Sequence, residues 1–155
     1  PVVEFLRSIG VMDIGRFLTR IPPILGFSVE RELLPKWKYL CKVSSDARFE
    51  VTKFPAYFSY PLDRVIKPRY EYIAQVKHFP TRLIAVERVI SFGDRDFAIK
   101  IMRDEDGGIA FREFAETISK PQKKNNKSNN KKRPKQKRAT QSFSLLLTEK
   151  EGDLK

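Results

Sequence analysis

The sequence has very few of the residues that build metal centres, disulfides and common catalytic sites. Its 155 residues include one cysteine, Cys41, and one histidine, His78. A single cysteine excludes a disulfide within the chain, and these two residues cannot form a Cys/His zinc site. The sequence also has no glycine-rich phosphate loop and no set of residues for a Ser/His/Asp arrangement. We therefore expect no enzyme activity, no cofactor and no metal.

Long hydrophobic runs are also missing. No window approaches about 18 consecutive apolar residues, so we expect no segment that crosses a membrane. The sequence begins at Pro1 rather than at methionine, and we expect any targeting peptide to lie outside these residues.

Most of the net charge of +12 comes from one segment. Residues 120–141 contain 10 Lys and Arg and no Asp or Glu, whereas residues 1–92 carry a net +6 and residues 93–119 a net −3. A tract with so little apolar surface cannot offset its ordering entropy, so we predict that residues 120–155 are disordered. Such a tract favours phosphate or acidic lipid surfaces, and the alternative is a solubilising tail. The tail residues expected to attract nucleic acid are Lys131, Lys132, Arg133, Lys135, Lys137 and Arg138.

Two stretches of the chain repeat each other at an offset of 33 residues without a gap. They are "RIPPILGFSVERELLPKWKYL", residues 20–40, and "KFPAYFSYPLDRVIKPRYEYI", residues 53–73. Prolines, aromatic residues and charge signs recur at equivalent positions. A period of this length is typical of stacked helical units. The sequence therefore predicts an all-α solenoid of short three-helix repeats.

Prolines and small polar residues indicate where the helices lie. Pro35 and Pro68 fit the first turn of a helix, where the missing N–H would be unpaired anyway. Asp13 and Asp46 fit the N-cap position. Helices also end before the prolines that open each repeat, because the residue before a proline avoids the α region. The predicted helices, as equivalent pairs, are 13–20 and 46–53, 28–33 and 61–66, and 35–43 and 68–77.

The repeat pattern stops after about residue 92, because position 101, where the next proline should fall, is isoleucine. We predict three domains: repeats over 1–92, a helical C-terminal cap over 93–119 and the tail over 120–155. The helices expected in this part of the chain are 80–91, 94–103 and 109–118.

Two smaller features are read as structural. The stretch "MRDEDGGIAFREF" resembles half of a calcium loop, but its first ligand position is Met102, which cannot coordinate a hard cation. We therefore interpret Gly107 and Gly108 as a turn between helices. Cys41 is equivalent to Ala74, a small apolar position, so we expect it in the core together with Trp37.

The stretch "FPAYFSYPLDRVIKPRYEYI", residues 54–73, is similar to the last repeat of plant members of the mitochondrial transcription termination factor (mTERF) family. The resemblance covers residues 1 to about 100, and "FGDRDF", residues 92–97, resembles the acidic-aromatic segment that ends such chains. It implies a helical solenoid that binds nucleic acid along a basic groove in mitochondria or plastids. The plant-like match favours the chloroplast over the mitochondrion.

Basic residues recur at equivalent repeat positions and would line one face of a solenoid. Phosphate contacts of this kind give salt-dependent affinity and position the protein without reading sequence. The predicted nucleic-acid contacts are Arg20, Arg31, Lys36, Lys53, Arg64, Lys67 and Arg69.

Some of these positions have a structural alternative. Arg31 and Arg64 follow an acidic neighbour and could form an ion pair. Arg20 and Lys53 could satisfy carbonyl groups of a last helical turn.

Two functions from different classes fit the sequence. The first is a monomeric factor that binds double-stranded DNA or structured RNA and works with the organellar transcription machinery, in transcription or its termination. The second is a protein-interaction scaffold in an organellar transcription or ribosome assembly complex. Tyr60, Tyr70 and Tyr72 could stack on bases in the first case, although aromatic residues of repeats are more often core.

Overall fold

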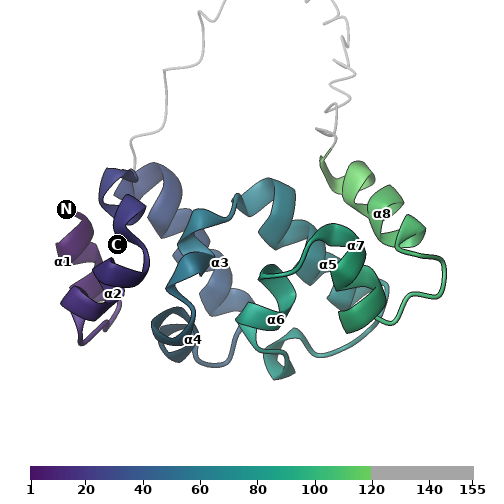
Figure 1. Ribbon diagram of the computed structural model, residues 1–155, viewed down its shortest axis with the longest axis horizontal. Coiled ribbons are helices and arrows are strands. Elements are labelled where there is room, and N and C mark those ends of the chain that lie inside the picture. The colour runs from purple at the N-terminus through teal and green to yellow at the C-terminus, as the bar shows by residue number, and fades with distance from the viewer. Residues whose placement is uncertain (120–155) are drawn as a thin grey trace, which may run out of the picture. The chain divides into compact units, whose positions relative to one another are not determined.

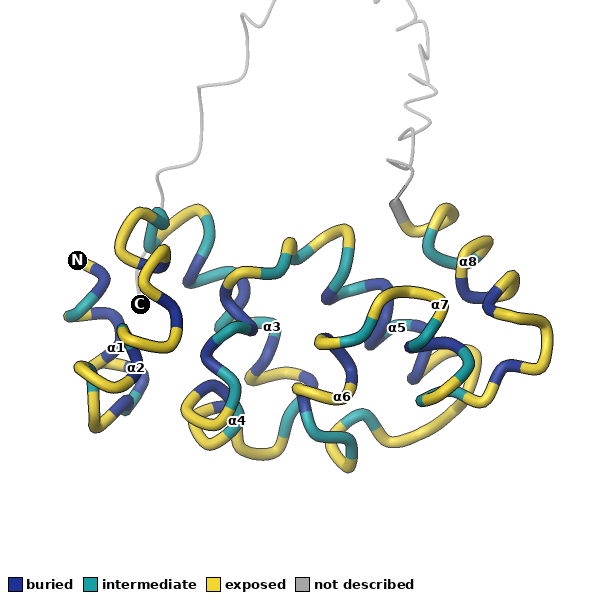
Figure 2. The backbone as a smooth tube through the Cα atoms, viewed as in Figure 1, coloured by how far each residue is buried: buried dark blue, intermediate teal, exposed yellow. Residues whose placement is uncertain are grey.

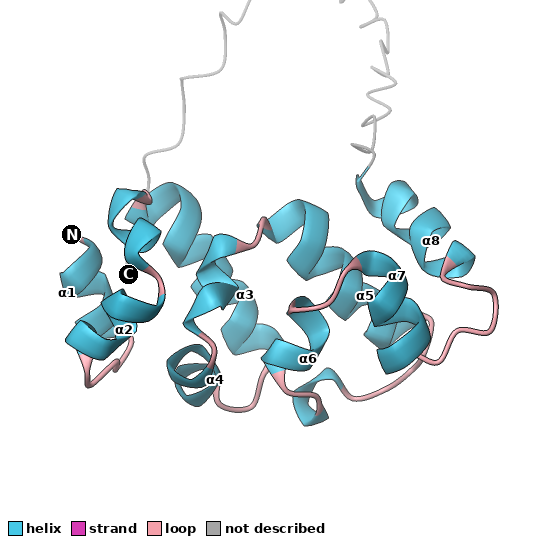
Figure 3. Ribbon diagram, in the orientation of Figure 1, coloured by secondary structure: helices cyan, strands magenta, loops and turns pink. Residues whose placement is uncertain are grey.

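The described part of the chain is built from helices and short loops. This computed structural model describes residues 1–119, which belong to one compact unit, Pro1–Gln122. Within residues 1–119 there is no β-strand, as Figure 3 shows. The prediction of an all-α fold is confirmed. The predicted disordered tail, including the six basic residues expected to attract nucleic acid, lies outside the described residues.

The helical elements recur at the offset of 33 residues that the sequence shows. The first set is α2 (Ile14–Arg20), η1 (Pro22–Gly26), η2 (Val29–Leu33) and α3 (Leu34–Val43). The second set is α4 (Ala47–Lys53), η3 (Pro55–Ser59), η4 (Leu62–Ile66) and α5 (Lys67–Gln75). The N-caps are as predicted, since Asp13 Oδ1 accepts from Arg16 N and Asp46 Oδ1 from Phe49 N, both at 2.9 Å.

The prolines have two effects that the sequence analysis did not predict. Pro22 follows the end of α2 and opens the five-residue 3₁₀ helix η1. Pro35 lies inside a continuous helix, because the π turn η2 runs directly into α3. In that turn Leu33 N donates to Ser28 O, five residues back, at 3.1 Å. The wider turn lets the helix continue past a residue that has no N–H to donate. Pro35 and Pro68 lie in the first turn of α3 and of α5, as predicted. The helices predicted separately at 28–33 and 35–43 are joined into one continuous helical stretch.

The C-terminal part follows the prediction less closely. It contains η5 (Thr81–Leu83), α6 (Val86–Ile90), α7 (Asp94–Asp96), η6 (Phe97–Ile101) and α8 (Ile109–Ser119). The single helix predicted at 80–91 is wrong, because the backbone is extended at Ile84. A new helix begins at Val86, whose N–H donates to the Glu50 carboxylate at 3.0 Å. The predicted turn is confirmed: Gly107 and Gly108 have φ of 72° and 89°, which glycine adopts readily.

Successive elements bury their apolar sides against one another. They follow one another in chain order from α1 (Val2–Ser8) and α2 to α8 (Figure 1). Buried segments recur in the helices from α1 to α6, as the dark blue stretches of Figure 2 show. The core includes the fully buried Leu6, Ile24, Leu33, Leu40, Val51, Phe58, Ile66 and Ile73. Continuous burial from one repeat to the next stabilises units that cannot bury their own apolar faces.

The prediction that Cys41 belongs to the core is wrong, because its side chain is exposed. The buried positions of α3 are Lys36, Leu40 and Val43, spaced at helical intervals. Cys41 directly follows Leu40 in the helix, so its side chain lies to one side of this buried stripe. Trp37 is partly buried and packs against the core.

Candidate nucleic-acid interface

The equivalent helices α2 and α4 border a cleft of about 360 Å³. Three cationic side chains line it, Arg16 and Arg20 from α2 and Lys53 from α4, and all three residues are exposed. One carboxylate, Asp13, also lines the cleft, and it caps α2. The cleft therefore carries an excess of positive charge. It also brings together Arg20 and Lys53, which the sequence predicted as equivalent phosphate contacts.

Arg20 connects the two helices that form this cleft. Its guanidinium donates to the carbonyl oxygens of Thr52 at 3.0 Å and Lys53 at 2.7 Å, in the last turn of α4. Those carbonyl groups have no partner within the helix. Arg20 thus satisfies carbonyl groups of a last helical turn, as the structural alternative predicted. That turn belongs to α4, in the next copy, and not to α2, which carries Arg20. Because the guanidinium carries more N–H groups than these bonds use, Arg20 can still donate to an anion.

An exposed aromatic ring lies among these cations. Phe49 is 57% exposed, and Lys53 Nζ lies 5.9 Å from its ring centroid. Neither Phe49 nor Arg16 was among the residues predicted from the sequence. They occupy equivalent repeat positions, 33 residues apart. Because Arg16 is charged, the equivalent position of Phe49 is expected to be exposed. The sequence could therefore have predicted an exposed ring there.

The structure gives Lys36 a structural role in place of the predicted phosphate contact. The residue is 7% exposed, and its Nζ donates to Phe58 O at 2.6 Å. Burial lowers the pKa of Lys36, and the Glu32 carboxylate acts in the opposite direction. Phe58 belongs to the next copy, so Lys36 fastens one copy to the following one. The prediction was wrong here because a repeat register does not say which way a side chain points.

Arg69, the equivalent of Lys36, is likewise removed from the set of phosphate contacts. It is 3% exposed and donates through Nη1 to Val89 O and Ile90 O, both at 2.9 Å. Its Nη2 donates to Asp94 Oδ1 at 2.8 Å. All three partners lie in the following elements α6 and α7. Arg69 therefore repeats the fastening role of Lys36 one copy later.

The remaining predicted cations are at the surface. Arg31 and Arg64 lie exposed on the π turns η2 and η4, and within residues 1–119 neither forms an ion pair. The ion-pair alternative is therefore not observed for them. Lys67 is bonded to Asp63 at 2.6 Å, four residues earlier on the same helical stretch. Exposed pairs of this kind contribute little stability, so Lys67 remains available to a stronger anion.

The family model for mTERF matches residues 1–98 of the 155-residue chain. The chain belongs to the mTERF family. Proteins of this family are generally nucleic-acid-binding regulators of organellar gene expression and are generally not enzymes. The resemblance seen in the sequence is thus confirmed. No curated protein and no solved structure matches the chain.

The repeat tyrosines of this mTERF chain are mostly core residues. Tyr70 is 2% exposed and Tyr72 is 1% exposed, so neither can stack on a base. Tyr60 is partly buried, with its ring centroid 6.2 Å from that of Phe54. Phe49 is therefore the better stacking candidate.

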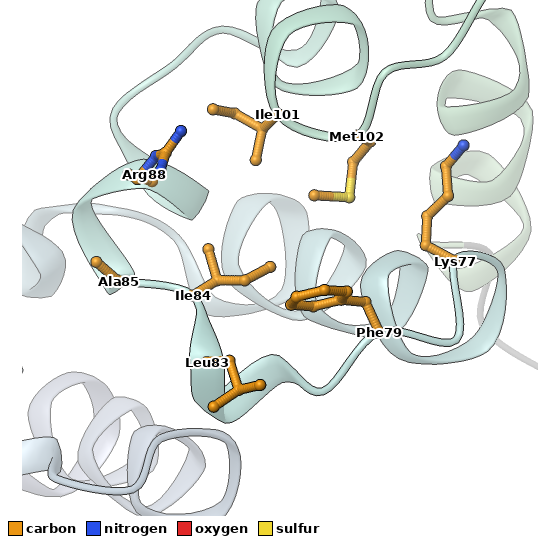
Figure 4. A pocket seen from close by; sticks show the side chains of 8 residues that line it. All are labelled: Lys77, Phe79, Leu83, Ile84, Ala85, Arg88, Ile101 and Met102. Carbon is orange, nitrogen blue, oxygen red and sulfur yellow. The ribbon is translucent and has the colours of Figure 1, made fainter.

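A second cavity of about 560 Å³, whose lining residues are mostly apolar, lies between the end of α5 and η6. Figure 4 shows Phe79, Ile84 and Met102 around it. Leu83 beside it is 74% exposed. The charged residues that line this cavity, Lys77 and Arg88, are both basic.

The carboxylates of the acidic segment before α8 accept hydrogen bonds from other residues of the protein. Asp104 is buried, accepts from Tyr72 Oη at 2.6 Å and pairs with Lys77. Asp106 accepts from Gly108 N at 3.0 Å and Ala110 N at 2.6 Å. The bond from Ala110 N is the main cause that lowers the pKa of Asp106. Asp106 thus serves the turn and the start of α8, whereas Asp104 joins this segment to Tyr72 and Lys77.

Residues 1–119 contain no group of three or more His, Cys, Asp or Glu that could hold a metal. They also contain no helix that is long and apolar enough to span a bilayer.

Proposed function

We propose that this chain binds double-stranded DNA or structured RNA through the α2–α4 cleft and so regulates organellar transcription or its termination. The observation that supports this is the convergence of Arg16, Arg20 and Lys53 from equivalent helices of two copies. Cations at repeat spacing suit a regularly charged phosphate backbone. Exposed Phe49 adds a face on which a base can stack.

The other exposed predicted cations extend this surface in the proposal. Arg31, Arg64 and Lys67 would add phosphate contacts that position the nucleic acid without reading its sequence. Residues 1–92 act as the binding repeats, residues 93–119 as the cap and residues 120–155 as a source of non-specific affinity. We place the protein in the chloroplast, with the mitochondrion as the alternative, and propose that it acts as a monomer.

The test is the affinity for duplex DNA and for RNA of equal length as a function of salt. It is measured on the full chain and on residues 1–119. Binding by residues 1–119 with a slope that indicates several phosphate contacts supports the proposal. Loss of all binding when residues 120–155 are removed contradicts it, because the described surface would then hold no nucleic acid.

The apolar cavity beside Phe79 favours a second function, a scaffold in an organellar transcription or ribosome assembly complex. Its occupant would be a partner segment with apolar and acidic side chains, since the charged residues lining the cavity are Lys77 and Arg88. A Leu83→Glu substitution separates the two functions. It leaves nucleic-acid affinity unchanged if the cleft is the binding surface, and it disrupts assembly if the scaffold function is correct.

A further inference from the structure

A hollow of about 510 Å³ lies between η4, α7 and α8. Three arginines line it, Arg64 from η4, Arg95 from α7 and Arg112 from α8. All three are exposed, and within residues 1–119 none of them forms an ion pair. The hollow therefore gathers like charges from three separate elements, an arrangement that an anion would stabilise.

The carboxylates of this hollow do not balance the arginines. Asp94 also lines it but already accepts the hydrogen bond from buried Arg69 at 2.8 Å. Glu116 is the other lining carboxylate, so one uncommitted carboxylate stands against three guanidinium groups. A planar guanidinium matches the geometry of phosphate oxygens, so phosphate fits this site better than a simple halide would.

The element that supplies Arg112 is held firmly in place. Phe111 of α8 packs its ring 5.0 Å from that of Phe97 and 5.2 Å from that of Tyr72. At Gly108, a Cβ atom would lie 3.2 Å from Ala98 Cβ, so the backbone before α8 approaches η6 closely. Packing of this kind fixes the position of a functional side chain. α8 lies beyond the residues that match the family, which end at 98.

We propose that Arg64, Arg95 and Arg112 hold a backbone phosphate of the bound nucleic acid. This inference rests on the proposed function and adds a contact that the repeats alone do not supply. α8 ends at Ser119, and the basic tract of residues 120–141 follows it directly in the sequence.

The test compares two double substitutions in the full chain, each of which removes two exposed arginines. Arg95→Ala with Arg112→Ala removes two of the three arginines that line the hollow. Arg82→Ala with Arg103→Ala is the matched control, because both residues are exposed and neither lines the hollow. Affinity for a labelled duplex DNA and a duplex RNA of the same length is measured between about 50 and 200 mM salt. A thermal melt of each variant checks that the fold is intact.

The hollow variant is expected to flatten the plot of log K against log salt by about one, because the contact to one phosphate is lost, and the control by much less. Equal slopes in the two variants would overturn the inference while leaving the proposed function intact. If the unmodified chain binds neither duplex, the proposed function and this inference fail together. If both variants keep the original slope, only the inference fails.

Discussion

The amino group of Lys36 donates to the carbonyl oxygen of Phe58 at 2.6 Å, and so joins one repeat copy to the next. Its equivalent, Arg69, donates in the same way to Val89 O and Ile90 O. A basic position that recurs at 33 residues is therefore a fastening between copies. Lys36 and Arg69 thus hold the copies together from buried positions, whereas Arg20 does so while it stays exposed to solvent.

The first prediction concerns Arg69. Arg69→Met leaves two buried carbonyl oxygens without their donor and lowers the free energy of unfolding by about 1.5–3 kcal/mol. The control, Lys67→Met, breaks the exposed ion pair with Asp63 and changes the free energy of unfolding by less than about 1 kcal/mol. Urea denaturation measures both values. An Arg69→Met variant that keeps its stability but shows a weaker salt dependence of nucleic-acid binding would contradict this role. It would support the phosphate contact predicted from the sequence.

The second prediction compares the same substitution at two buried tyrosines. Tyr57→Phe removes a hydrogen bond of 2.9 Å to Lys36 O and costs about 0.5–1.5 kcal/mol. Tyr70→Phe removes a buried hydroxyl that has no partner within the described residues, so it is neutral or stabilising. Equilibrium unfolding of the two variants checks the difference. Equal losses at both positions would contradict the hydrogen-bond assignment.

The third prediction concerns alkaline pH. Burial raises the pKa of Tyr57 and of Tyr70 above the ordinary value of 10.0. The folded state keeps these protons when the unfolded state loses them. Stability is therefore fully present below about pH 10 and falls as pH rises further, by up to about 1.4 kcal/mol per pH unit for each tyrosine.

Urea denaturation between pH 8 and 11 measures this trend. The lowered pKa of Lys36 acts in the opposite direction up to its ordinary value of 10.5, so the decisive comparison is with Tyr57→Phe. This variant should lose stability less steeply with pH than the original chain. An identical slope in the variant would show that Tyr57 ionises in the folded state as it does in the unfolded state.

The fourth prediction concerns Phe49. Phe49→Ala removes the exposed ring of the cleft and weakens binding to RNA with unpaired bases by about 1–3 kcal/mol, without changing the salt slope. The control is Phe79→Ala, which also removes an exposed ring but lies at the apolar cavity. Fluorescence anisotropy measures both affinities. Equal losses in the two variants would argue against stacking in the cleft.

The sequence predicted those features of the fold that depend on local chemistry. α2 and α4 begin within one residue of their predicted starts, because Asp13 and Asp46 cap them through contacts to nearby N–H groups. The break before α6 was not predictable in this way. There the N–H of Val86 is satisfied by Glu50, 36 residues earlier in the chain. Partners so far apart in sequence leave no local pattern.

The candidate site was predictable in part for the same reason. The repeat offset correctly placed Arg20 and Lys53 at equivalent positions, and the structure brings them to one cleft. The offset gave no information on side-chain direction, so it could not separate these residues from buried Lys36 and Arg69. Phe49 was missed because its residue type indicates core, although the charged Arg16 at the equivalent repeat position indicates an exposed site.

The most direct test of the account is the salt dependence of duplex binding by two further double variants of the full chain. Arg16→Ala with Lys53→Ala removes two cations from the α2–α4 cleft, and Lys38→Ala with Lys42→Ala removes two exposed cations of α3 outside it. The cleft variant is expected to flatten the slope of log K against log salt by about two, and the α3 variant to change it much less. A larger loss in the α3 variant would contradict the account and move the binding surface away from the cleft.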